Sequence, residues 1–271
     1  MVKIELKGYT GIVTGGASGI GKSITQKLLE AGAKVIIGDI DEKSGKETMK
    51  EFSEKYGGCD FFKVDVSKVE DVKKMVEEVS KKYEKINYLV NNAGISIPRL
   101  LVDPAEKEEI TEEIFDKMVS VNQKGTVFFT QAVVREMIKK KIKGVVVNIA
   151  SECGLEGSEG QSVYASTKAA LYSFTRSWAK ELGKFGIRVV GVAPGILEPT
   201  KLRTPEYERA LAYTRGITVE ELRESYEKVS IPLRRVGKLE EVANVVCFLI
   251  SDLASYITGT VINISGGKSR A

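Results

Sequence analysis

The sequence predicts an α/β protein with a Rossmann-type, doubly wound parallel sheet flanked by helices. Short apolar runs rich in β-branched residues alternate with amphipathic stretches along the 271 residues, and a glycine-rich turn follows the first apolar run. Repeated strand–helix units favour parallel strands joined by right-handed crossovers. Because no Pro/Gly/Ser-rich linker, low-complexity tract or solenoid repeat interrupts the alternation, we expect one domain over residues 1–271.

The first βαβ unit is predicted over residues 9–39. A strand over 9–14 is followed by the glycine-rich turn Gly15–Gly21, a helix over 22–31 and a second strand over 34–39. Amide groups at the start of such a helix suit a pyrophosphate. The spacing is Gly-x-x-x-Gly-x-Gly, and tight turns need glycine in any case. Only the strand–turn–helix context makes the turn an indication of a dinucleotide site.

Asp39 ends the second predicted strand, about twenty residues after the glycine turn, as in dinucleotide-binding units. A carboxylate there accepts hydrogen bonds from a ribose and repels a 2′-phosphate, which favours NAD over NADP. The alternative is that Asp39 caps the helix that begins at Glu42.

The alternation continues to the end of the chain. Further strands are predicted over 59–64, 86–90, 144–150, 187–192 and 260–264, with helices over 69–83, 112–140, 165–182 and 239–249. Residues 196–232 form an excursion without a strand signal, with two short helices predicted over 205–214 and 219–229. Since it follows the carboxyl end of a strand, the excursion is expected to overhang the ligand site, either as a lid over substrate or as a surface or oligomer contact.

Ser151, Tyr164 and Lys168 lie around the junction between the strand over 144–150 and the helix that follows. Residues four apart on a helix share one face, so Tyr164 and Lys168 converge with Ser151 above the strand end. A tyrosine has a pKa of about 10, and a nearby ammonium favours its phenolate. The trio therefore suits proton exchange with an alcohol or carbonyl, although Tyr-x-x-x-Lys also occurs by chance on helices.

Composition excludes several classes of function. Histidine is absent, which removes Ser-His-Asp catalysis and histidine metal ligands, and no metal site is expected. The net charge of +4 comes from interleaved lysines and acids, so no nucleic-acid partner is expected. No apolar stretch reaches the roughly 18 residues of a membrane span. Three scattered cysteines fit a cytoplasmic protein.

In their order and spacing, the motifs resemble those of the short-chain dehydrogenase/reductase family across nearly the whole chain. The matching residues are Thr14-Gly15-x-x-x-Gly19-x-Gly21, Asn91-Asn92-Ala93-Gly94, Asn122, Ser151, Tyr164-x-x-x-Lys168 and Pro194-Gly195. The resemblance implies a catalytic, dinucleotide-binding domain that transfers hydride between NAD(P) and a carbonyl or alcohol without a metal.

The resemblance also implies a role for each site residue. Tyr164 is the acid/base, Lys168 lowers its pKa and holds the nicotinamide ribose, Ser151 binds the substrate oxygen, and Asn122 holds a water of the proton relay. The expected NAD contacts are Gly15, Ser18, Gly19, Ile20, Gly21, Asp39, Ile40, Asp65, Val66, Asn92, Ala93, Gly94, Tyr164, Lys168, Pro194, Gly195 and Leu197. The family often has a threonine five residues after the proline of Pro-Gly. Here that position is Pro199 and Thr200 follows it, which leaves the carboxamide contact open.

Two loops outside the cofactor motifs, residues 154–161 and 212–218, resemble those of bacterial members that act on polyol phosphates. This likeness implies NAD-dependent oxidation of sorbitol 6-phosphate to fructose 6-phosphate. Arginine suits the substrate phosphate because its planar guanidinium binds two oxygens at once. Carboxylates could accept hydrogen bonds from the polyol hydroxyls. The substrate contacts considered are Arg99, Glu152, Glu156, Lys201, Arg203 and Arg215. Exposed basic residues are usually solvated, so for any single one of Arg99, Lys201, Arg203 and Arg215 a surface role is favoured, and the hypothesis is that at least one of the four contacts phosphate.

Two other functions stay open. The same chemistry serves other small-molecule substrates, such as a 3-oxoacyl thioester or a gluconate-type compound, although a thioester reductase usually prefers NADPH, which Asp39 disfavours. A non-catalytic NAD-binding sensor commonly loses the tyrosine or lysine that this sequence retains. The resemblance also implies a homo-oligomer, a tetramer or dimer, built through the helices that begin near Glu112 and Val163.

Overall fold

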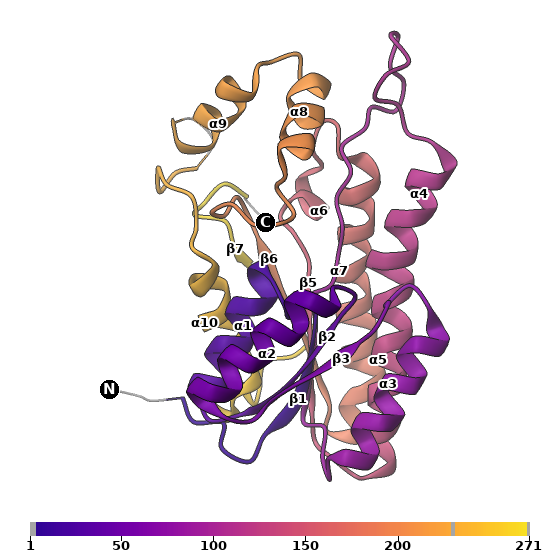
Figure 1. Ribbon diagram of the computed structural model, residues 1–271, viewed down its shortest axis with the longest axis vertical. Helices are drawn as coiled ribbons and strands as arrows, with labels where there is room; N and C mark the ends of the chain where they lie inside the picture. The colour runs from indigo at the N-terminus through magenta and orange to yellow at the C-terminus, as the bar shows by residue number, and fades with distance from the viewer. Residues whose placement is uncertain (1–3, 229–230, 270–271) are drawn as a thin grey trace.

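The computed structural model describes residues 4–228 and 231–269 and has three layers, with a central sheet between two layers of helices (Figure 1). The sheet has the strand order β3-β2-β1-β4-β5-β6-β7, and every pairing in it is parallel. The strands are β1 (Thr10–Thr14), β2 (Lys34–Asp39), β3 (Cys59–Lys63), β4 (Tyr88–Asn91), β5 (Val145–Ile149), β6 (Arg188–Pro194) and β7 (Val261–Ile264). The predicted single-domain, doubly wound Rossmann-type fold is confirmed.

Helices cover both faces of the sheet. One face carries α1 (Gly19–Glu30), α2 (Glu42–Tyr56) and α10 (Leu239–Ile250), whose apolar side chains share a core with the strands. The other face carries α3 (Val69–Lys82), α5 (Thr126–Lys139) and α7 (Ser162–Leu182), with a second core beneath them. Because both faces are covered, every residue of β1, β4 and β5 is buried, which explains their nearly continuous apolar sequences.

The helix predicted over 112–140 is interrupted. It consists of α4 (Glu112–Val119), a π-helical turn, η1 (Ser120–Gly125), and α5. Such turns are rare and often occur at functional positions, and this one contains Asn122. Three shorter elements were not predicted, namely α6 (Cys153–Glu156), η2 (Gly183–Phe185) and η3 (Asp252–Ala254).

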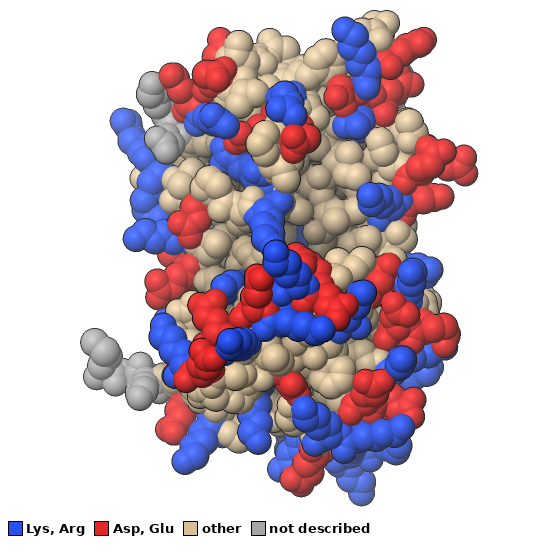
Figure 2. Space-filling view, viewed as in Figure 1, with Lys and Arg blue, Asp and Glu red and all other residues tan. Residues whose placement is uncertain are grey.

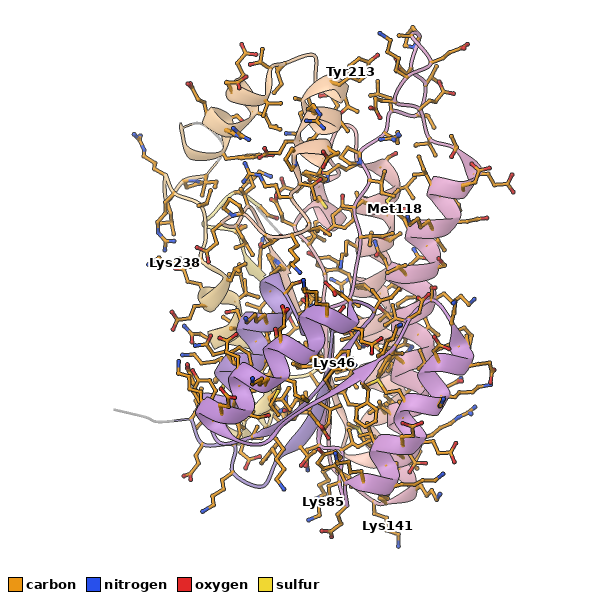
Figure 3. The ribbon with its side chains drawn as sticks, in the orientation of Figure 1. Lys46, Lys85, Met118, Lys141, Tyr213 and Lys238 are labelled. Atoms are coloured by element: carbon orange, nitrogen blue, oxygen red, sulfur yellow. The ribbon has the colours of Figure 1, made fainter. Side chains whose placement is uncertain are left out.

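The excursion forms a cap above the carboxyl ends of the strands, at the top of Figure 1. It contains α8 (Pro205–Thr214) and α9 (Val219–Lys228); the predicted helix end at 229 lies outside the described residues. Thr204 caps α8 by accepting a bond from the Tyr207 amide at 3.2 Å. The cap has its own small apolar core around Leu211 and Leu222. Tyr213, at the upper end of α8 in Figure 3, donates to the Asp103 carboxylate.

A buried polar ladder ties the sheet to the helices that carry the site. The Asn91 amide donates to Thr130 on α5 at 2.8 Å and to the Asn148 side chain at 2.9 Å. Asn148 in turn donates to Thr175 on α7 at 2.9 Å. Both asparagines are at most 4% exposed. Since unpaired polar groups are costly inside a core, the ladder fixes α5 and α7 against β4 and β5.

Asn148→Ala is expected to lower the free energy of unfolding by about 1–3 kcal/mol, because it removes one hydrogen-bond partner each from buried Asn91 and Thr175. Urea unfolding of the variant and of Asn244→Ala, which changes an exposed asparagine of α10, measures the effect. A loss no larger than that of Asn244→Ala would contradict the assigned role of the ladder.

Candidate active site

A cavity of about 710 Å³ opens at the carboxyl edge of the sheet, beneath the cap. Parallel α/β sheets place their ligands at this edge, where the strand order reverses between β1 and β4. Around it, Lys and Arg side chains are interleaved with Asp and Glu over the face shown in Figure 2. No helix among the described residues is both long and apolar enough to cross a membrane.

The glycine-rich turn builds one end of the cavity. Gly15 and Gly19 have positive φ angles of 63° and 52°, which side chains rarely adopt. A Cβ at Gly21 would lie 2.0 Å from the Gly15 carbonyl oxygen, so only glycine allows α1 to start so close to the turn. The Asn92 amide holds the turn by donating to the carbonyls of Thr14 and Gly15 at 2.9 and 3.1 Å. This cradle at a helix N-terminus fits a pyrophosphate.

Asp39 lies in the cavity at the end of β2. Its carboxylate accepts hydrogen bonds from the amides of Ala17 and Asp41 at 3.1 and 3.0 Å. The alternative role as the cap of the next helix is wrong, because Asp41 caps α2 by accepting from the Ser44 amide. Beside it, Ile40 is 62% exposed and provides an apolar surface suited to a flat base.

Ser151, Tyr164 and Lys168 meet at the centre of the cavity. Ser151 follows β5, while Tyr164 and Lys168 lie in the first two turns of α7. The Lys168 ammonium donates to the Ile149 carbonyl at 2.8 Å and lies 5.8 Å from the centre of the Tyr164 ring. Tyr172 donates to the Ser151 carbonyl at 3.0 Å and so fixes the backbone of the serine.

Burial dominates the electrostatics of these groups. It raises the pKa of Tyr164 above its ordinary value, and a hydrogen bond with Ser151 acts in the opposite direction. Burial also lowers the pKa of Lys168 to about 8. The expected lowering of the Tyr164 pKa is therefore not seen in this structure, where loss of hydration around the phenolate is the main cause that raises it.

Asn122 braces the site from outside the cavity. Its side chain accepts from the Ile95 amide and donates to the Ile95 carbonyl, both at 2.9 Å, and it also donates to Thr167 on α7 at 2.9 Å. The side chain thus ties the loop after β4 to the helix that carries Tyr164 and Lys168. Binding of a relay water by Asn122 stays a prediction.

The structure brings most of the residues predicted for the cofactor to this one cavity. Those that line it are Gly15, Ser18, Gly19, Ile20, Asp39, Ile40, Asp65, Val66, Asn92, Ala93, Gly94, Tyr164, Lys168, Pro194, Gly195 and Leu197. Gly21 does not line the cavity, and its role is to let α1 pack against the Gly15 carbonyl. Thr200 lies against the turn, with its Cβ 3.3 Å from the position of a Cβ at Gly19.

Two of the predicted substrate residues lie elsewhere. Arg99 does not line the cavity, and its guanidinium pairs with Glu108 at 2.6 Å. Glu156 is exposed on α6 and does not line it either. Although both are near the site in sequence, Arg99 is held by its pair with Glu108, and Glu156 lies on the exposed side of a short helix.

Three basic residues predicted for substrate do line the cavity. Arg203 donates through Nε to Glu208 at 2.8 Å, and its guanidinium lies 4.4 Å above the Tyr226 ring. Arg215 donates to the Ser158 hydroxyl at 3.1 Å. Lys201 pairs with Ser44 and Asp41, near Asp39, and so faces the end of the cavity opposite the cap core.

Several cavity residues were missed by the sequence analysis. Tyr207 lines the cavity and accepts from Gln161 at 2.8 Å, and Lys268 reaches it from beyond β7 to pair with Glu152. Gly266-Gly267 follows the last predicted strand and indicates a turn at the same edge of the sheet. This turn was the one sequence feature that could have predicted Lys268 near the cavity.

A dinucleotide-sized cavity with a serine, a tyrosine and a lysine at its centre defines an oxidoreductase of alcohols or carbonyls. A family model described as enoyl-(acyl carrier protein) reductase matches residues 15–269. The chain belongs to the short-chain dehydrogenase/reductase family, whose members bind a nicotinamide cofactor.

Characterised relatives differ in what their names say they act on. The chain is 55% identical to a sorbitol-6-phosphate 2-dehydrogenase of Klebsiella pneumoniae, over 98% of each chain. It is 42% identical to a 3-oxoacyl-(acyl-carrier-protein) reductase of Thermotoga maritima, over 97% of this chain and 99% of the relative. Its structure is similar to that of a 3-ketoacyl-(acyl-carrier-protein) reductase of Brucella melitensis complexed with NADH. That similarity has a TM-score of 0.83 and 30% identity, and covers 98% of this chain and 100% of the other.

The rate of alcohol oxidation is expected to rise with pH through the neutral range. Because burial raises the pKa of Tyr164, the phenolate is the minor form there, and its fraction grows about tenfold per pH unit. Tyr164→Phe should lower kcat by about 10²–10⁴-fold and abolish this slope while leaving cofactor binding intact. Tyr256→Phe, at a fully exposed tyrosine, is the control. A flat profile in the unsubstituted enzyme would remove Tyr164 from proton transfer.

Proposed function

We propose that the protein is an NAD-dependent dehydrogenase of a polyol phosphate, which interconverts sorbitol 6-phosphate and fructose 6-phosphate. The observation that carries the proposal is the pair of arginines, Arg203 and Arg215, which the cap places in the same cavity as Tyr164. The 55% identity to the Klebsiella pneumoniae sorbitol-6-phosphate 2-dehydrogenase supports the same substrate class.

The arginines leave an excess of positive charge under the cap. Glu208 receives bonds from both Arg203 and Arg223, at 2.8 and 2.6 Å. Hydrogen bonding by Arg223 is the main cause that lowers the pKa of Glu208. The Glu208 carboxylate is therefore ionised, and its single negative charge is shared between Arg203 and Arg223. Arg215 has no carboxylate partner among the described residues. A phosphate dianion, which arginine binds well through paired N–H groups, would balance the excess.

The chain's own residues account for the proton side of the reaction. Ser151 and Tyr164 hold the hydroxyl oxygen of the substrate, and Tyr164 takes its proton during oxidation and returns it during reduction. Lys168 holds the nicotinamide ribose. When Lys168 is protonated, its positive charge also favours the phenolate form of Tyr164. Nicotinamide, when bound, accepts or supplies the hydride.

Tyr207 belongs to α8 of the cap and lines the cavity. Its hydroxyl accepts from Gln161 at 2.8 Å, and its ring lines the same cavity as Tyr164 and Arg215. A substrate that reaches from Tyr164 to Arg215 would share this cavity with Tyr207. A polyol phosphate carries its reacting alcohol and its phosphate on different carbons. It can therefore place the alcohol at Tyr164 and the phosphate at the arginines.

We propose NAD as the cofactor because Asp39 carries its charge where a 2′-phosphate would lie. Asp39→Asn keeps an oxygen for the Ala17 amide while it removes the charge. This variant is expected to raise kcat/KM for NADP relative to NAD by tenfold or more, at about 1.4 kcal/mol per factor of ten. Steady-state kinetics with both cofactors measure the ratio. A preference of the unsubstituted enzyme for NADP would overturn the cofactor assignment.

A second function with specific support is reduction of a 3-oxoacyl thioester, which the 42% identical Thermotoga maritima relative is named for. The arginines under the cap count against a purely apolar acyl chain at that position. A non-catalytic sensor is disfavoured because Ser151, Tyr164 and Lys168 all face the cavity.

We also propose a homo-oligomer, a tetramer or dimer, assembled through the outer surfaces of α4 and α7. Phe115 on α4 is 46% exposed, and the stacked rings of Phe174 and Trp178 on α7 are only partly buried. Apolar surface of this kind favours association. A solution mass near 29.7 kDa by light scattering, the mass of one chain, would refute it.

The phosphate assignment is tested by comparing sorbitol 6-phosphate with sorbitol as substrates. Arg203→Ala or Arg215→Ala is expected to lower kcat/KM for the phosphate ester by about 10–100-fold and to leave that for sorbitol nearly unchanged, because a charged hydrogen bond is worth about 1.5–3 kcal/mol. Arg209→Ala is the matched control, since Arg209 is exposed on α8 and pairs with Glu206 outside the cavity.

Equal turnover of the two polyols by the unsubstituted enzyme would refute the phosphate ester as substrate. Faster turnover of a 3-oxoacyl thioester than of sorbitol 6-phosphate would favour the second function instead.

A further inference from the structure

A buried ion pair lies beside the proposed catalytic serine. Glu152 follows Ser151 directly and is only 6% exposed. Its Oε1 atom accepts from the Lys268 ammonium, and both residues line the cavity. Its Oε2 atom is buried and has no hydrogen-bond donor among residues 4–228 and 231–269. One carboxylate oxygen is therefore paired and the other is left without a partner.

Strand ends fix both members of the pair. The Glu152 amide donates to the Pro194 carbonyl, at the end of β6, at 3.1 Å. Lys268 follows Gly266 and Gly267, whose positive φ angles of 63° and 88° turn the chain back after β7. The Lys268 amide then donates to the Ser265 carbonyl at 3.2 Å. The pair is thus built on the rigid edge of the sheet rather than on the cap.

A buried carboxylate oxygen that receives no hydrogen bond from the protein is costly, because burial removes part of its hydration and no protein donor replaces it. If the Glu152–Lys268 pair served only to hold the C-terminal segment against the sheet, the unpaired Oε2 atom would have no role. A ligand hydroxyl that donates to Oε2 would remove the cost, and the position of the pair in the cavity makes such a hydroxyl available.

The pair is close to the reacting groups. The Cys153 thiol donates to the Ser151 hydroxyl at 3.2 Å. Burial is the main cause that raises the pKa of this thiol, and the hydrogen bond with Ser151 acts in the opposite direction. Glu152 and Lys268 also line the same cavity as Ser151, Tyr164 and Lys168.

We propose that Glu152 and Lys268 bind hydroxyl groups of the substrate on the carbons next to the one that is oxidised. This inference rests on the proposed polyol phosphate dehydrogenase. The carboxylate accepts a hydrogen bond and the ammonium donates one, which matches neighbouring hydroxyls that can do both. The pair then recognises the polyol chain, and Arg203 and Arg215 recognise the phosphate from the cap.

The pair also provides selectivity among alcohols. A substrate without the neighbouring hydroxyl leaves Oε2 buried and unpaired, so it binds less well in the transition state. An acyl thioester chain is such a substrate. We therefore assign Glu152 and Lys268 as specificity-determining residues of this chain.

The test is a thermodynamic cycle that removes the carboxylate or ammonium from the protein and a hydroxyl from the substrate. The variants are Glu152→Gln and Lys268→Met, and the substrates are sorbitol 6-phosphate and its 1-deoxy and 3-deoxy analogues. Glu240→Gln is the control, since Glu240 belongs to the exposed ion pair with Lys27. Thermal midpoints and NAD affinity of all variants are measured alongside kcat/KM.

On sorbitol 6-phosphate, each site variant is expected to lose about 10–100-fold in kcat/KM. At least one deoxy analogue should cost the unsubstituted enzyme a similar factor. With that analogue the variants should lose little more, because the missing hydroxyl and the missing side chain belong to one contact. NAD affinity and the Glu240→Gln kinetics should not change.

Equal losses with all three substrates would show that the pair acts only on the structure of the site, and this would overturn the inference while leaving the proposed function standing. Absence of turnover of sorbitol 6-phosphate by the unsubstituted enzyme would overturn both. Lys268→Met keeps the test decisive if Glu152→Gln does not fold, because Lys268 is the more exposed partner.

Discussion

The buried ammonium of Lys168 is the constraint on which the site depends. It is 5% exposed and donates to the Ile149 carbonyl at the end of β5, and loss of hydration lowers its pKa to about 8. Such a group keeps its place only if its surroundings are rigid. Two hydrogen bonds hold α7 on either side of Lys168. One joins Asn148 to Thr175, and the other joins Asn122 to Thr167. The position of Tyr164 follows from the same contacts.

The cavity has two halves of different origin. The cofactor half is built by strand ends and the first turn of α1, which the parallel sheet brings to one edge. The proposed substrate half is built mainly by the cap and by the segment after β7, which lie outside the sheet. One fold can carry different sites, and relatives of 55% and 42% identity to this chain do carry names with different substrates.

The sheet and the cofactor half were predictable because their signals are local. Continuous apolar runs mark strands that are buried on both faces, and the four-residue spacing of Tyr164 and Lys168 places them on one helical face. The substrate half was less predictable because it depends on tertiary contacts. Arg99 turns away to Glu108, and Lys268 reaches Glu152 across 116 positions of sequence. Asp41, rather than Asp39, caps α2, a difference of two residues that propensity does not resolve.

The central claim is that this cavity transfers hydride from a carbon of a polyol phosphate to NAD, with Tyr164 exchanging the proton. The most direct test uses sorbitol 6-phosphate carrying deuterium at carbon 2 and mass analysis of the reduced cofactor. We expect one deuterium in each NADH formed, fructose 6-phosphate without the label, and about 10²–10⁴-fold less of both products with Tyr164→Phe at matched times. Unlabelled NADH formed from the labelled substrate would contradict this claim.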